Sequence, residues 1–91
     1  MKSLSLKLVL AATVAAASLS AIAAPKCTAE PKSKWLPEAE MKAKIAAMGY
    51  QVKEFEISGH CYEIYGHDKD GKKVEIYFNP VDASIVKEKR S

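Results

Sequence analysis

The side chains best suited to chemistry in this 91-residue sequence are two cysteines, Cys27 and Cys61, and two histidines, His60 and His67. An even pair of cysteines in an oxidising compartment predicts a disulfide. Loop-closure entropy gives such a bridge, across about 34 residues, a stabilisation of up to ~3.8 kcal/mol. Two alternatives stay open from the residues alone. They are thiolate metal binding together with His60, and lipidation of Cys27, although no lipoprotein signal precedes it.

The histidines give little support for a metal or haem site. Their spacing along one expected strand is odd, which places His60 and His67 on opposite faces, so they cannot easily share an ion. Haem ligation by one of them alone is the alternative that stays open. The segment Asp68-Lys69-Asp70-Gly71-Lys72 begins like a calcium loop, but it lacks the later ligands, and a hairpin turn explains it.

Catalytic groupings are also missing from the sequence. Ser58-Gly59-His60 predicts a turn, whereas a nucleophile elbow would need a glycine on each side of the serine. A bridged Cys61 could not supply a thiolate to the neighbouring histidine. We therefore predict that the protein is no enzyme and that it carries no cofactor and no metal.

The first residues have the pattern of a secretory signal peptide. Lys2 and Lys7 precede an apolar run over residues 8–17, and Ala21 and Ala23 provide the small residues of a cleavage site. The alternative is an uncleaved membrane anchor, but the run is short and rich in alanine for a spanning helix. We predict that residues 1–23 are a signal peptide and that the protein is periplasmic or secreted, with no stable membrane insertion after cleavage.

Charge and length narrow the functional classes further. Removal of Lys2 and Lys7 with the leader lowers the formal net charge from +3 to about +1. Nucleic-acid binding needs a concentrated basic face, so we predict no nucleic-acid partner. The one locally basic segment, Lys87-Glu88-Lys89-Arg90, is expected to be a solvated, frayed end. The rest of the chain is long enough for one domain with one modest core.

The apolar pattern predicts one helix followed by a small sheet. Pro37 suits the first turn of a helix, Gly49 suits its C-terminal cap, and Met41, Ile45 and Met48 form one apolar stripe between them. After Gly49 the apolar period becomes two, which predicts strands over residues 50–57, 61–65, 74–78 and 84–87, with a bulge near Lys53. The predicted fold class is α+β, one helix packed on a three- to four-stranded antiparallel β-meander. An extended N-terminal arm over residues 24–34 is expected to precede a domain over residues 35–91.

The order of these signals resembles the PepSY domain, and more narrowly the small stand-alone periplasmic PepSY-like proteins of bacteria. The resemblance covers about Trp35 to Val86. It rests on the predicted helix, Gly49-Tyr50, Cys61-Tyr62-Glu63-Ile64-Tyr65, Asp68-Lys69-Asp70-Gly71, Val74-Glu75-Ile76-Tyr77-Phe78 and Asn79-Pro80. Many members carry a glycine in the final turn, where this chain has Asp82-Ala83-Ser84, so a looser turn is expected.

The resemblance implies a function in binding. PepSY units occur in peptidase propeptides, where they are thought to restrain proteolysis, and others belong to bacterial membrane proteins, including ones of electron transfer. Because no peptidase is attached to this sequence, the partner is expected to be a separate protein. The predicted function is regulation or inhibition of a partner such as a peptidase. The alternative is an accessory factor of a membrane redox or sensor protein, with contact to haem.

Two surfaces are predicted to bind that partner. One helix covers only one face of a sheet, so the other face, with Tyr65, Glu75 and Tyr77, is expected to be open. The competing interpretation is that the tyrosine rings pack across strands and cover the disulfide. The outer face of the helix is the second candidate, through its small residues Ala39, Ala43 and Ala46.

Overall fold

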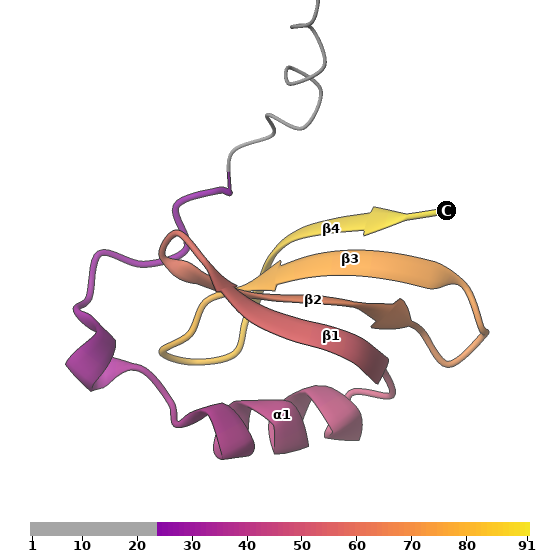
Figure 1. The fold of residues 1–91 in the computed structure, drawn as a ribbon, viewed down its shortest axis with the longest axis horizontal. Helices are drawn as coiled ribbons and strands as arrows, with labels where there is room; N and C mark the ends of the chain where they lie inside the picture. The colour runs from indigo at the N-terminus through magenta and orange to yellow at the C-terminus, as the bar shows by residue number, and fades with distance from the viewer. Residues whose placement is uncertain (1–23) are drawn as a thin grey trace, which may run out of the picture.

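The computed structural model describes residues 24–91, so the predicted leader and its cleavage site lie outside the described residues. A short 3-10 helix, Lys32–Lys34, and helix α1, Glu38–Ala47, precede four strands: β1 (Gln51–Ser58), β2 (Cys61–His67), β3 (Lys73–Phe78) and β4 (Ile85–Arg90). The strands form one antiparallel sheet in sequence order, and α1 lies across one of its faces (Figure 1). The predicted α+β meander is therefore confirmed. In the described part of the chain, no helix is long and apolar enough to cross a membrane.

Helix α1 begins and ends close to the predicted residues. Pro37 is the N-cap, Glu38 and Glu40 lie in the first turn near the positive end of the helix dipole, and Gly49 follows the helix with a φ of 98°. Met41 and Ile45 are fully buried against the sheet. Met48, the third member of the predicted stripe, is 42% exposed, because the helix ends before this residue can reach the core.

The core lies between α1 and the sheet, and the segment before the helix closes one end of it. The Trp35 indole N–H donates to the Glu30 carbonyl at 3.1 Å, and its ring meets Tyr62 edge-on with centroids 5.4 Å apart. The Tyr62 hydroxyl in turn donates to the Leu36 carbonyl at 2.7 Å. The arm is thus folded back through a 3-10 turn and is not extended throughout. The buried cluster comprises Trp35, Met41, Ile45, Tyr62, Ile64, Val74, Ile76, Phe78 and Ala83.

The predicted bulge in β1 is present and brings two strands into close contact. The pairing shifts between Val52, which faces Gly66, and Glu54, which faces Tyr65. At Gly66 the strands approach so closely that an added Cβ would lie 1.9 Å from the Gln51 carbonyl oxygen. Only glycine therefore fits at this point of β2 without moving the backbone of β1.

We expect Gly66→Ala to lower the free energy of unfolding by more than about 2 kcal/mol, because backbone must move to remove the clash. Urea unfolding followed by circular dichroism measures this loss. Gly71→Ala is the matched control, since its Cβ would meet nothing within 4 Å and only the φ of 83° opposes it. That variant should lose about 1 kcal/mol. Equal losses in the two variants would contradict the close-approach explanation.

The basic C-terminal segment differs from the sequence-based expectation. It forms the second half of β4, where Glu75 faces Lys89 and Val74 faces Arg90. Arg90 forms an ion pair with Asp68, which is 8% exposed, so the segment is held at its far end as well. The prediction of a frayed end was wrong because the segment pairs with β3, and because Lys89 and Arg90 form ion pairs with Glu75 and Asp68 on other elements.

The turn before β4 is also tighter than the resemblance implied. Ala83 takes the place of the expected glycine with a φ of 66°, and it is buried. Its N–H donates to the Asn79 carbonyl, and the Asn79 N–H donates to the Ser84 carbonyl, both at 2.8 Å. Two backbone hydrogen bonds and burial of the methyl group hold this left-handed residue in place.

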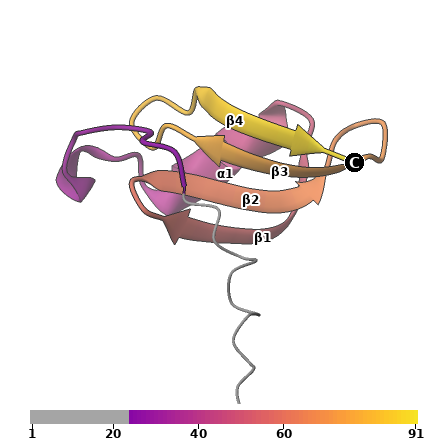
Figure 2. The ribbon, with the colours of Figure 1, turned by 90° about the horizontal axis from the view of Figure 1, so that it is seen from above.

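The structure contains the predicted disulfide between Cys27 and Cys61, whose Cα atoms are 5.2 Å apart. Cys61 is fully buried and Cys27 nearly so, and both pack against Tyr77 together with Ala24. The bridge therefore fixes the arm to the sheet face that α1 leaves uncovered. Figure 2 looks onto that face, with the arm beside β2 and β3 and the helix behind the sheet.

We expect the double variant Cys27→Ala, Cys61→Ala to be less stable by about 2–4 kcal/mol, because its unfolded chain regains the entropy of an open 34-residue loop. Urea unfolding of the variant and of the wild type, with and without reductant, measures the difference. Reductant should destabilise the wild type alone. A difference below about 1 kcal/mol would show that the arm is held by its other contacts.

Candidate functional site

The sheet face opposite α1, here called the open face, carries polar side chains in rows that cross all four strands. Paired residues of neighbouring strands point to the same face, so the register defines these rows. The first contains Glu56, Glu63, Tyr77 and Lys87, and the second contains Glu54, Tyr65, Glu75 and Lys89. Each row thus runs from an acid on β1 to a base on β4.

The centre of the open face holds two carboxyl groups on neighbouring strands. Glu63 of β2 is only 2% exposed, and its Oε2 atom is buried without a conventional hydrogen-bond partner among the described residues. The pKa of Glu63 is raised to about 7, chiefly by burial and in smaller part by a side-chain interaction with Glu75. The same interaction lowers the pKa of Glu75. The opposite shifts make Glu63 the member of the pair that keeps its proton to the higher pH.

Two tyrosines flank the carboxyl pair. The Tyr77 hydroxyl donates to Glu75 Oε2 at 3.1 Å, and burial followed by the charge of Glu63 raises the pKa of this phenol. The pKa of Tyr65 is raised chiefly by its hydrogen bond to Glu63. Both phenols are therefore neutral donors at ordinary pH. Hydrogen bonds from the two phenols stabilise a carboxyl pair that carries one negative charge. They are not sufficient to stabilise a pair that carries two.

The two tyrosines differ sharply in exposure. Tyr77 is 4% exposed and packs against the disulfide and Ala24, which agrees with the part of the competing interpretation that placed a tyrosine on the disulfide. The expectation that Tyr77 lies on an open surface is therefore wrong. Tyr65 is 39% exposed, and Glu75 is half-buried beside it. Of the three predicted open-face residues, Tyr65 is the one whose ring a partner protein could cover.

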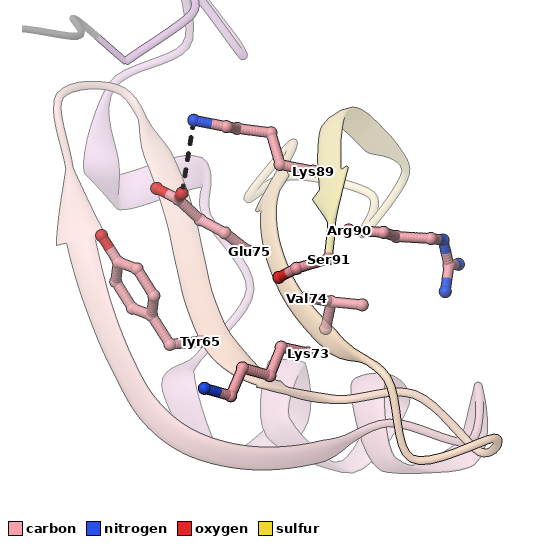
Figure 3. A pocket seen from close by; sticks show the side chains of 7 residues that line it. All are labelled: Tyr65, Lys73, Val74, Glu75, Lys89, Arg90 and Ser91. Atoms are coloured by element: carbon pink, nitrogen blue, oxygen red, sulfur yellow. Dashed lines mark ion pairs between the residues drawn. The ribbon is translucent and has the colours of Figure 1, made fainter.

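A shallow hollow of about 270 Å³ lies beside Tyr65, between β3 and β4. Lys89 reaches over it to Glu75, with Nζ and Oε1 3.9 Å apart, while Arg90 points away from both (Figure 3). Its lining residues are Tyr65, Lys73, Val74, Glu75, Lys89, Arg90 and Ser91. The hollow combines an aromatic ring, one acid and two amines, which suits a polar segment of another chain better than an apolar ligand.

The other sequence-based candidates lie away from this hollow. Asp68 accepts the backbone N–H groups of Asp70 and Lys72, both at 2.9 Å, and the bond from Lys72 is the main cause of its lowered pKa. These bonds build the β2–β3 hairpin turn, as the sequence indicated. His60 is exposed in the β1–β2 turn, and His67 ends β2. Within residues 24–91, no three His, Cys, Asp or Glu side chains come together as a metal site.

The outer face of α1 is separate from the open face. Ala39, Ala43 and Ala46 are all exposed there, so the structure leaves this second predicted surface uncovered. Leu36 is half-buried and packs against the core. A partner-binding role for the three alanines stays a prediction.

Comparison with known proteins gives one match. A family model described as the peptidase propeptide and YPEB domain, abbreviated PepSY, matches residues 7–89. The chain belongs to the PepSY family. The match includes both cysteines and every strand that builds the open face. No curated protein and no solved structure matches the chain. The description of the PepSY family is that of a propeptide-like regulatory module and names no catalytic residues.

We expect the carboxyl pair to make the stability of this PepSY domain depend on pH. Because the pKa of Glu63 is raised on folding, the folded protein holds an extra proton between about pH 4.5 and 7. The free energy of unfolding should therefore fall as pH rises through this window and level off above it. A fall of about 1–3 kcal/mol is expected, since the pair lies near solvent that partly screens it. Urea unfolding across this pH range measures it.

The variant Glu63→Gln should remove most of that slope, because an amide cannot ionise but still donates to Glu75. Glu56→Gln is the matched control, since Glu56 faces Glu63 on β1 but is exposed. It should keep the slope of the wild type. The assignment to Glu63 is wrong if the Gln variant keeps that slope as well.

Proposed function

We propose that this chain is an exported PepSY module that binds and restrains a separate protein, with a peptidase as the first candidate. The family match supports a propeptide-like, inhibitory role. The structure adds a small domain with an exposed aromatic ring beside a polar hollow. Aromatic side chains of this kind often dominate protein–protein interfaces.

Export to the periplasm or secretion is part of the same proposal. The leader pattern of residues 1–23 supports it, together with a disulfide of which both halves are buried. Disulfides persist mainly in oxidising compartments. A separate inhibitor would also have to meet its peptidase outside the cytoplasm.

The exposed ring of Tyr65 is the observation on which the proposed contact surface depends. It stands next to Lys73 and Lys89, whose amines add polar contacts at the rim of the hollow. Tyr77 and Glu63, by contrast, are buried on the part of the same face where the arm packs. A partner is therefore expected to contact the β3–β4 side of the open face and not the side under the disulfide.

The test is inhibition of proteolysis by the oxidised protein. Hydrolysis of fluorescent casein by periplasmic extract of the source organism should fall as the protein is added. Tyr65→Ala should raise the concentration needed for half inhibition about tenfold, as loss of an interface aromatic does. Circular dichroism checks that this variant is folded, because the Tyr65 side chain is 39% exposed and interacts with Glu63. Unchanged casein hydrolysis at saturating protein would contradict peptidase restraint.

A variant on the helix distinguishes the two predicted surfaces. Ala43→Arg places a large charge in the middle of the outer face of α1 without touching the core. If the open face binds, this variant should inhibit as well as the wild type. Loss of inhibition in Ala43→Arg with full inhibition in Tyr65→Ala would move the contact to the helix.

A further inference from the structure

Within residues 24–91, each of the two outer strands of the sheet has a paired strand on one side only. The order of the strands places β1 at one edge and β4 at the other. Each edge leaves a row of backbone N–H and C=O groups that another strand could pair with. Both edges also carry exposed apolar side chains: Val52 and Ile57 on β1, and Ile85 and Val86 on β4, each 36–47% exposed.

The charges of the two edges are opposite. On the open face, β1 carries Glu54 and Glu56, and β4 carries Lys87 and Lys89. In the part of the chain that the structure describes, Glu54, Glu56 and Lys87 take part in no ion pair. Pairing of two β1 edges would place acids opposite acids, and pairing of two β4 edges would place bases opposite bases. Opposite charges therefore favour pairing of the β4 edge of one copy with the β1 edge of another.

The register of the sheet makes this pairing specific. Within one molecule, β1 and β4 run antiparallel, so a second copy beside β4 continues the alternation of strand directions. Extending the two rows across this junction places Lys87 opposite the second copy's Glu56, and Lys89 opposite its Glu54. The row of Ile57, Tyr62, Phe78 and Ile85 lies on the other face. Because β4 has an extra residue between Ile85 and Lys87, regular antiparallel pairing from Lys87 places Val86 opposite the second copy's Ile57, and Ile85 opposite its Ser58.

The helices leave room for such an arrangement. Four strands at a spacing of about 4.8 Å separate equivalent points of neighbouring copies by ~19 Å. One helix with its side chains is about 10–12 Å across, so α1 of one copy clears α1 of the next. The exposed apolar side chains of Val86 and the second copy's Ile57 would then lie opposite each other at the junction of the joint sheet.

We propose that this protein self-associates by docking the β4 edge of one copy antiparallel onto the β1 edge of a second copy, in the register that pairs Lys87 with Glu56. The contact joins two different edges, so it propagates as a chain or closes as a ring and does not stop at a two-fold dimer. One strand pair buries little surface, so the association is weak and depends on concentration.

Zero-length cross-linking with a carbodiimide tests the register directly. Within one copy, Glu56 and Lys87 are three strand spacings apart, about 14 Å, which is too far for a direct amide link. A mixture of unlabelled and heavy-nitrogen-labelled protein is cross-linked at high concentration and analysed by mass spectrometry. We expect a mixed-isotope link between Glu56 and Lys87. Mixed links spread evenly over exposed acids and lysines, or none, would overturn the proposal.

Charge reversal provides the second test. Glu56→Lys and Lys87→Glu should each abolish the rise of the sedimentation coefficient with concentration, and an equal mixture of the two variants should restore it. Glu40→Lys and Lys34→Glu make the same charge changes at exposed positions away from both edges, and should behave as the wild type. Circular dichroism checks that every variant is folded. A mixture that stays monomeric, or single variants that still associate, would overturn the proposal.

Discussion

A single ten-residue helix against a four-stranded sheet is the constraint on which the rest of this structure depends. One helix covers one face, and it supplies only Met41 and Ile45 as fully buried side chains. The side chains on the second face must find their contacts without another helix. The chain does so with a disulfide-tethered arm over one half and with a polar network over the other. In the described part of the chain, this PepSY domain therefore has one whole sheet face without a covering helix.

The polar network brings two carboxyl groups together, which is electrostatically unfavourable. Two carboxyl groups in a mostly buried position cannot both ionise without strong repulsion, and hydrogen bonds from neutral phenols stabilise a negative charge without neutralising it. The buried Glu63 makes this face sensitive to proton concentration near neutrality. It also holds the β2 and β3 side chains in one arrangement, because each phenol has a defined acceptor. The exposed Tyr65 and the hollow beside it lie next to this polar network.

Much of the fold follows from local signals in the sequence. Pro37 and Gly49 bound the helix by their backbone preferences, and Gly71 marks the β2–β3 turn. The carboxyl pair was not predicted, although a signal was present. Once the turn is centred on Asp70, antiparallel pairing sets Glu63 opposite Tyr77 and Tyr65 opposite Glu75. Alternation then places both acids on one face. Local periodicity could identify the face, but the burial of Glu63 depends on contacts far apart in the chain.

The sequence by itself determined the class of fold, the helix boundaries and the bulge, because each depends on neighbouring residues, and it predicted the disulfide that the structure then showed. Only the tertiary structure decided which tyrosine is covered, how long β4 is and which acid holds the extra proton. The arm reaches Tyr77 from a distant part of the sequence, and Arg90 is fixed by an acid in another turn. Exposure and ionisation are properties of a whole environment, and no local pattern in the sequence records them.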